Sequence, residues 1–373
     1  DSGSAVTIVN TTALDLVALT AASLNVTAGG AVTDSGTLAI AGATTISASG
    51  QDITLDEAAS TFGTLALTGA NVAVTDAGAT DLGASTVSGT LGITSGGAVT
   101  DSGTLAITGV TTISASGQDI TLDEAASTFG TLSLTGANVA VTDAGATDLG
   151  ASTVSGTLGI TSGGAITDSG TLAITGAATF DNSGGTNDAI TLDDSSNSFN
   201  GSVTFTTDSG SAVTIVDTTA LDLVALTAAS LNVTAGGAVT DSGTLAITGA
   251  TTISASGQDV TLDEAASTFG TLSLTGANVA VTDAGATDLG ASTVSGTLGI
   301  TSGGAITDSG TLAITGATTI SASGQDITLD EAASTFGTLA LTGANVAITD
   351  AGATDLGAST VSGTLGITSA GAV

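Results

Sequence analysis

The fold is decided by a stretch that recurs along the chain, whose first complete copy reads DSGTLAIAGATTISASGQDITLDEAASTFGTLALTGANVAVTD at residues 34–76. Within it, short aliphatic runs such as Leu38-Ala39-Ile40 and Leu65-Ala66-Leu67 are separated by Ser-Gly, Ala-Gly or Thr-Gly. Short runs with period-two alternation and glycine punctuation predict brief β-strands joined by turns. The density of Gly, Thr and Val, without a sustained 3.6-residue period, disfavours helix.

The tetrad Asp-Ser-Gly-Thr divides the chain into tandem blocks. They are 1–33 (partial), 34–100, 101–167, 168–240 (diverged), 241–307 and 308–373. The regular blocks 34–100, 101–167 and 241–307 are nearly identical in sequence and equal in length. Repetition at a fixed period predicts a stacked architecture in which each unit buries its apolar side against its neighbour.

Each block subdivides further, because three of its strands end on an aspartate. In the first block these are Asp34, Asp56 and Asp76, and Asp101 opens the next block after a step of similar length. We therefore predict an all-β fold, a right-handed parallel β-helix (β-solenoid) with coils of about 20–25 residues and about sixteen coils, continuous over residues 1–373. A tandem array of small β-sandwiches is the alternative, but no linker composition separates the blocks.

In such a solenoid the inward positions take aliphatic side chains and the outward positions take Thr and Ser. Gly is expected at corners with positive φ, and the absence of Pro suits strands that need every N–H. One phenylalanine per block is expected to fill a wider part of the core: Phe62, Phe129, Phe199, Phe269 and Phe336.

The composition excludes several functions. The chain has no Lys, Arg, His or Cys and carries 34 acidic residues, so its formal net charge is -34. We expect no nucleic-acid partner, because no side chain can neutralise phosphates. Nucleophilic triads, zinc sites and phosphate loops lack their residues, so we predict that the protein is not an enzyme. No apolar run approaches the ~18 residues of a membrane span. The sequence opens in mid-repeat, as a window from a longer protein would.

The strand-ending aspartates are expected to line one corner, coil after coil. These are Asp34, Asp56, Asp76, Asp101, Asp123, Asp143, Asp168, Asp193, Asp217, Asp241, Asp263, Asp283, Asp308, Asp330 and Asp350. Carboxylates about 5 Å apart repel by ~1 kcal/mol in water and ~3 kcal/mol at an effective dielectric constant of about 20. One solution is local: each aspartate accepts backbone N–H groups in an Asx-turn.

The other solution is bound Ca²⁺, which prefers several oxygen ligands. No cofactor is required, but Ca²⁺ is possible at the Asp-Glu pairs Asp56, Glu57, Asp123, Glu124, Asp263, Glu264, Asp330 and Glu331. A second set alternates Asp with Asn in one stack and is predicted to be structural: Asp52, Asp119, Asp259 and Asp326 against Asn71, Asn138, Asn278 and Asn345. Turn or surface positions are expected for Asp81, Asp148, Asp288 and Asp355. The acids of the diverged block, Asp181, Asp188, Asp193 and Asp194, suggest a longer loop rather than a catalytic cluster.

The phrases at 52–63, 69–76 and 95–103, in that order and recurring along the whole chain, resemble the repeats of filamentous-haemagglutinin-like and other giant bacterial surface adhesins. The resemblance implies a right-handed β-helix exported to the cell surface or released as a fibre. We therefore expect an extracellular stalk or filament that self-associates end-to-end or laterally. The alternative is an adhesin module whose ladders contact host or matrix glycans or proteins.

Overall fold

The computed structural model describes residues 3–373, which form β-strands and turns without any helix. Contacts divide the chain into two compact units, Asp1–Gly185 (unit 1) and Thr186–Val373 (unit 2). Each unit is a parallel β-solenoid, and the chain winds through about 19 coils, somewhat more than the sixteen expected. The prediction of parallel stacked coils is confirmed.

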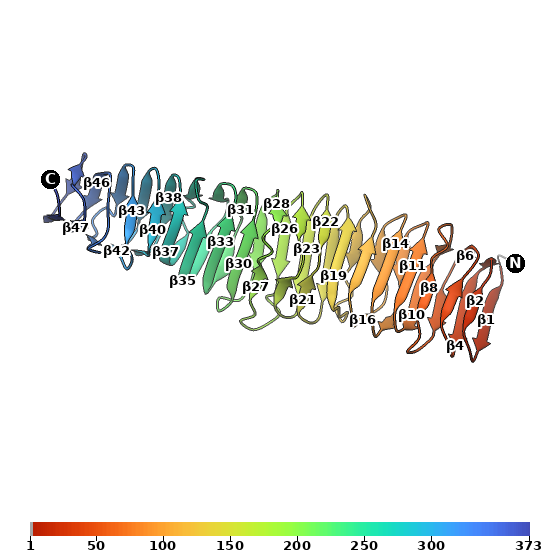
Figure 1. The fold of residues 1–373 in the computed structure, drawn as a ribbon. Coiled ribbons are helices and arrows are strands. Elements are labelled where there is room, and N and C mark those ends of the chain that lie inside the picture. Colours follow the sequence, from red (N-terminus) through yellow and green to blue (C-terminus); the bar gives the residue numbers. More distant parts are fainter. Residues whose placement is uncertain (1–2) are drawn as a thin grey trace. The chain divides into compact units, whose positions relative to one another are not determined.

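Each coil of unit 1 has two sides. Face 1 opens with the parallel ladder β1 (Ala5–Asn10), β4 (Ser23–Ala28), β7 (Thr44–Ser47) and β10 (Thr64–Gly69). Face 2 opens with β2 (Leu14–Leu16), β5 (Val32–Asp34), β8 (Ile53–Leu55) and β11 (Val72–Asp76). In Figure 1, β8, β11 and β14 (Leu91–Ser95) follow one another along one side of this unit. Backbone groups in each strand therefore pair with the coils before and after it.

The coil is shorter than the aspartate spacing suggested. On face 2, Val72 lies beside Leu91, Leu91 beside Thr111 and Thr111 beside Leu132. Each of these pairings joins one coil to the next, so a coil is at the short end of the expected range. The block 34–100 is therefore longer than three such coils.

A half-coil, meaning one side of one coil, takes one of two forms. A straight half-coil is a single strand such as β10. A broken half-coil is two short strands in succession; β12 (Thr80–Leu82) and β13 (Ser85–Val87), for example, pair with the two ends of the straight strand β10. Thr64 pairs with Asp81 and Thr68 with Thr86, so the broken side holds one residue more over the same span.

The first full block contains seven half-coils. In order they are broken β5 and β6 (Leu38–Ile40), straight β7, broken β8 and β9 (Thr61–Phe62), straight β10, straight β11, broken β12 and β13, and straight β14. Because seven is odd, the next block starts on the opposite side: β5 lies on face 2, whereas its counterpart β15 (Val99–Asp101) pairs with β12 on face 1.

Unit 2 obeys the same rule. β34 (Val239–Asp241) is laddered with β36 (Val260–Leu262) and then β38 (Val279–Asp283). The equivalent strand of the next block, β42 (Ile306–Asp308), is laddered with β39 (Thr287–Leu289) and β45 (Ile327–Leu329) in the other sheet. Equivalent residues of consecutive blocks therefore lie on opposite faces within each unit.

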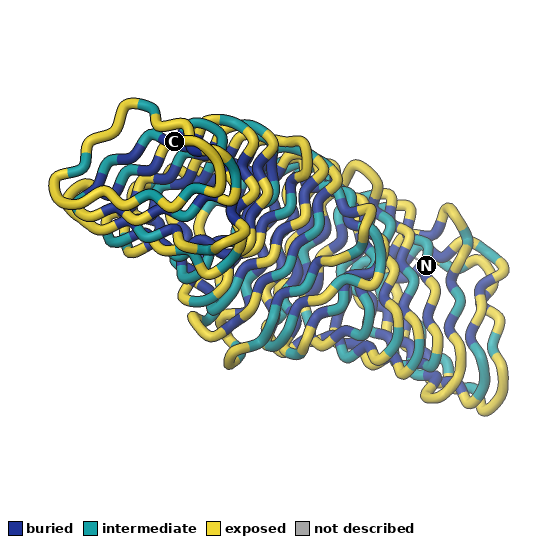
Figure 2. The backbone as a smooth tube through the Cα atoms, turned by 60° about the vertical axis from the view of Figure 1, so that its left-hand side comes forward, coloured by how far each residue is buried: buried dark blue, intermediate teal, exposed yellow. Residues whose placement is uncertain are grey.

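The core of each unit is the aliphatic column that the alternation predicted. In Figure 2 buried residues alternate with more exposed ones along the strands. The five recurrent phenylalanines are all buried, between 0% and 7% exposed. Burial of this inward set supplies the apolar driving force for stacking, at roughly 25 cal/mol per Å² of apolar surface removed from water.

Glycine has a different main role from the one expected. Only Gly50, Gly117, Gly257 and Gly324 have positive φ among the glycines of residues 3–373. Many others lie where one coil touches the next: a Cβ on Gly63 would lie 2.6 Å from the carbonyl oxygen of Gly42 and 2.8 Å from that of Ala41. These glycines are required by close contact between coils rather than by backbone conformation.

Candidate functional site

The strand-ending aspartates do not form one column. Asp34 and Asp76 end strands of face 2, where Asp76 pairs with Ser95, whereas Asp101 ends β15 on face 1. The step from Asp76 to Asp101 therefore covers about one and a half coils. The expectation of a single acidic corner was wrong. The spacings between successive strand-ending aspartates add up to one block, and a block is seven half-coils long, which is not a whole number of coils.

The third of the three strand-ending aspartates in a block is buried, and its carboxylate accepts a backbone N–H in an Asx-turn. Asp76 is 1% exposed, and its Oδ1 accepts the N–H of Gly78 at 2.9 Å. Its Oδ2 accepts the hydroxyl of Thr80 at 3.3 Å, and the Thr80 hydroxyl lies 2.9 Å from that of Ser95. The Oδ1 of Asp143, Asp217, Asp283 and Asp350 likewise accepts the N–H two residues on. The local solution is confirmed at these positions.

The first of the three strand-ending aspartates in a block accepts a hydrogen bond from a backbone N–H of the next coil. Asp34 is 8% exposed; its Oδ1 accepts the N–H of Asp56 at 2.9 Å, and its Oδ2 is buried without a hydrogen-bond partner. Burial raises the pKa of Asp34, and the carboxylates of Asp56 and Glu57 add to the rise while backbone N–H groups oppose it. Burial raises the pKa values of Asp101, Asp241 and Asp308 in the same way.

The Asp-Glu pairs proposed for Ca²⁺ lie on the turn that follows each of these contacts. In all four pairs the aspartate is exposed, and its N–H donates to the first strand-ending aspartate of the block, one coil earlier. Within residues 3–373 no three Asp, Glu, His or Cys side chains are grouped closely enough to hold a metal ion. The pairs therefore offer at most two carboxylates per turn, a weak starting set for an ion that takes six to eight oxygens.

A chelator experiment tests calcium directly. We expect the thermal unfolding midpoint to stay within about 1 °C when EDTA is added, because each turn offers at most two carboxylates, too few to hold Ca²⁺ tightly. The measurement is circular dichroism melting with EDTA, and with CaCl₂ or MgCl₂ at matched ionic strength. A Ca²⁺-specific rise in the midpoint that is lost when Asp56, Asp123, Asp263 and Asp330 are all changed to Asn would contradict this expectation.

Two sets of outward-facing acidic residues form hydrogen-bonded ladders. The side-chain amide of Asn71 donates to Asp52 at 2.9 Å, and the N–H and hydroxyl of Thr90 donate to Asn71 at 3.1 and 3.2 Å. Each Asp–Asn pair is therefore structural, as predicted, but the pairs of consecutive blocks lie on opposite faces and do not form one stack. Asp81 points outward from β12, and its Oδ2 accepts the hydroxyls of Thr64 and Ser102, both at 2.8 Å, from the coils on either side.

The acids of the diverged block serve local turns. Asp181 Oδ1 accepts both the N–H and the hydroxyl of Ser183. Asp194 Oδ1 accepts the N–H of Ser196 at 2.9 Å, and Asp188 Oδ2 accepts that of Thr186 at 3.2 Å. These contacts are typical of turn residues.

The fold and these side chains define a tandem-repeat parallel β-solenoid whose polar groups mainly join coil to coil. Within residues 3–373 no helix is long and apolar enough to cross a membrane. The chain belongs to the family described as repeats of unknown function (DUF5649), whose model matches residues 3–68, 69–135, 136–206, 210–275, 276–342 and 343–373. No curated protein and no solved structure matches the chain. The family period equals the block of seven half-coils, read from a different starting residue.

Proposed function

We propose that the chain is a structural region of a bacterial extracellular fibre or surface adhesin, where it acts as a stiff spacer. The observation that carries this proposal is the unbroken parallel pairing within each regular block. β11, β14, β17 (Thr111–Ser114) and β19 (Thr131–Gly136) are joined over four or five residues at each step. Each added block contributes three and a half coils of the same kind, so repetition adds length rather than new chemistry.

The surface supports the same function. Outward residues on face 2 are small or hydroxylated, as in the row Thr75, Thr94, Ser114 and Thr135. Without Lys or Arg the chain offers no trypsin-type cleavage site, which suits an extracellular location. In the alternative function, adhesion to glycans or proteins through the ladders, these same rows of hydroxyl groups would form the contact surface.

Chains with different numbers of blocks test whether the repeats form a stiff spacer. Concatemers of two, four and six copies of residues 101–167 should lengthen by about 17 Å per block, because three and a half coils at about 4.8 Å each are added. Small-angle X-ray scattering gives the maximum dimension. A dimension that grows only as the cube root of mass would contradict the proposal, because it would mean that the blocks collapse into globules.

We also propose that the chain self-associates end-to-end. When residues 1–373 are taken alone, β1 pairs with β4 of the following coil, and Val9 on β1 and Val17 just after β2 are 75% and 67% exposed. Exposed strand edges with apolar side chains pair readily with other chains. Sedimentation velocity should show oligomers that increase with concentration, and Val9→Lys should reduce them. A monomer at all concentrations would contradict this proposal.

A further inference from the structure

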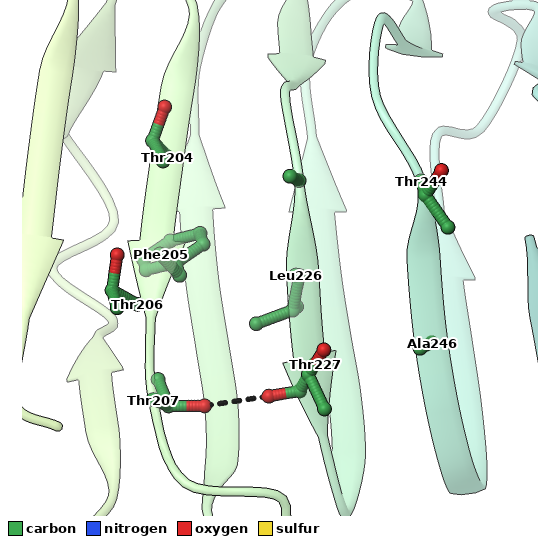
Figure 3. A pocket seen from close by; sticks show the side chains of 9 residues that line it. Thr204, Phe205, Thr206, Thr207, Leu226, Thr227, Thr244 and Ala246 are labelled. Atoms are coloured by element: carbon green, nitrogen blue, oxygen red, sulfur yellow. Dashed lines mark hydrogen bonds between the residues drawn. The ribbon is translucent and has the colours of Figure 1, made fainter.

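Unit 2 contains a groove at a contact between half-coils that the diverged block alters. Its cavity of about 360 Å³ is lined by Thr204, Phe205, Thr206, Thr207, Ala225, Leu226, Thr227, Thr244 and Ala246. These residues come from β29 (Val203–Thr206), β32 (Leu226–Ala228), β35 (Leu245–Ser254) and the residues beside them. Figure 3 shows the threonines distributed along the three strands, with Phe205 and Leu226 between them.

The groove has a sequence cause. In a regular broken half-coil of unit 2, the Ser292 hydroxyl accepts the N–H of Leu274 at 3.0 Å and donates to the carbonyl of Gly290 at 2.9 Å. This serine joins β37 (Thr268–Gly276) to β40 (Ser292–Val294), and the ladder continues at Thr275 and Thr293.

In the diverged block Leu226 takes the place of the serine, and Phe205 takes the place of Leu274. Both strands then present larger apolar side chains where a hydroxyl had linked them. β29 remains paired with β31 (Leu221–Leu223) through Val203 and Leu223, whereas β32 is laddered with the first residues of β35. The two strands are linked instead by the Thr207 hydroxyl, which donates to the carbonyl of Thr227 at 2.7 Å.

The lining combines an apolar floor with uncharged polar walls. Phe205 and Leu226 are each 3% exposed and form the floor, whereas Thr206, Thr227 and Thr244 are exposed at the rim. Threonine presents both a hydroxyl and a methyl group. No charged side chain lines the groove, and a net charge of -34 repels anions.

We propose that this groove binds one residue of a neutral glycan. A pyranose ring has hydroxyls at its edge and C–H groups on its faces, which match threonine hydroxyls at the rim and apolar side chains at the floor. The cavity is at the small end of the range of ligand sites, which suits a single sugar rather than a chain. The site is independent of the spacer function, since it arises from two substitutions in the diverged block.

A matched pair of variants tests the site. Ala246 lies in the groove beside Thr227, and Ala313 holds the same position beside Thr293 in a regular half-coil. Ala246→Leu should fill the groove and weaken binding about tenfold or more, whereas Ala313→Leu should leave the affinity within about twofold. Leu226→Ser, which reintroduces the regular serine, should weaken binding as well.

The probes are maltose, cellobiose, lactose and chitobiose, measured by saturation-transfer NMR with the full chain, and melting curves confirm that each variant folds. We expect at least one neutral disaccharide to bind with millimolar affinity and to lose affinity only in the groove variants. The proposal would be overturned by no binding of any probe at about 10 mM, by equal binding in Ala246→Leu, or by equal binding of sulfated or sialylated analogues.

Discussion

The protein should become more stable as the pH falls from 7 to about 4.5, the reverse of ordinary acid unfolding. Burial raises the pKa values of Asp34, Asp76, Asp101, Asp143, Asp217, Asp241 and Asp308. A carboxyl with a folded pKa above its unfolded value stabilises the protein when protonated. That contribution is complete below the unfolded pKa, near 3.8, and is lost as the pH rises through the folded pKa.

General repulsion acts in the same direction, because 34 carboxylates have no cationic side chain to offset them. We expect a rise of about 5 °C or more in the melting midpoint between pH 7 and pH 4.5 at low salt. Added NaCl at pH 7 should recover only the part of this rise that comes from exposed charges, because buried groups are poorly screened. A midpoint that falls steadily with pH would contradict the account.

A pair of variants distinguishes two effects on the melting midpoint, that of burying a carboxylate and that of the net charge. Asp34→Asn removes a buried carboxylate whose Oδ2 lacks a partner and keeps the Oδ1 that accepts the Asp56 N–H. It should raise the midpoint at pH 7 but not at pH 4. Asp56→Asn removes the same charge from an exposed neighbour and should have a smaller effect. Equal effects of the two substitutions at pH 7 would show that only net charge matters.

The second large effect is expected from a glycine between coils. Gly63→Val places a Cβ against two backbone carbonyls of the previous coil, those of Gly42 and Ala41, neither of which can rotate away. Separating the coils there breaks the pairing of β7 with β10, so we expect a loss of about 3 kcal/mol or more in unfolding free energy.

Gly92→Val is the matched control. Gly92 lies in β14, and the nearest atom to its added Cβ is the Val72 carbonyl oxygen at 3.8 Å, an ordinary contact. Valine suits a strand better than glycine, so stability should be unchanged or slightly higher. Urea unfolding of both variants gives the comparison, and equal losses would show that glycine is needed here for backbone freedom instead.

The sequence is sufficient to predict strands and parallel stacking, because alternation such as Leu65-Ala66-Leu67 and exact repetition are local signals. It could not give the coil length from the aspartates alone. Asp34 to Asp56 is one coil, yet Asp76 to Asp101 is about one and a half, and only the pairing of Asp76 with Ser95 distinguishes the two cases. Which runs pair is a property of the three-dimensional register.

The groove follows from a sequence difference that the acidic residues of the diverged block do not reveal. Comparison of Ala225-Leu226-Thr227-Ala228 with Ala291-Ser292-Thr293-Val294 shows a leucine replacing serine. The meaning of that exchange depends on the Ser292 hydroxyl bridge, which no single-sequence pattern reveals.

The odd number of half-coils per block has a consequence for how such genes can vary. Unequal crossing-over between near-identical repeats removes or adds whole blocks. Loss of one block would rotate everything downstream by half a turn and exchange its two sides, whereas loss of a pair would restore the original orientation. A ligand that approaches from a fixed direction would therefore distinguish odd from even copy numbers, although every coil remained intact.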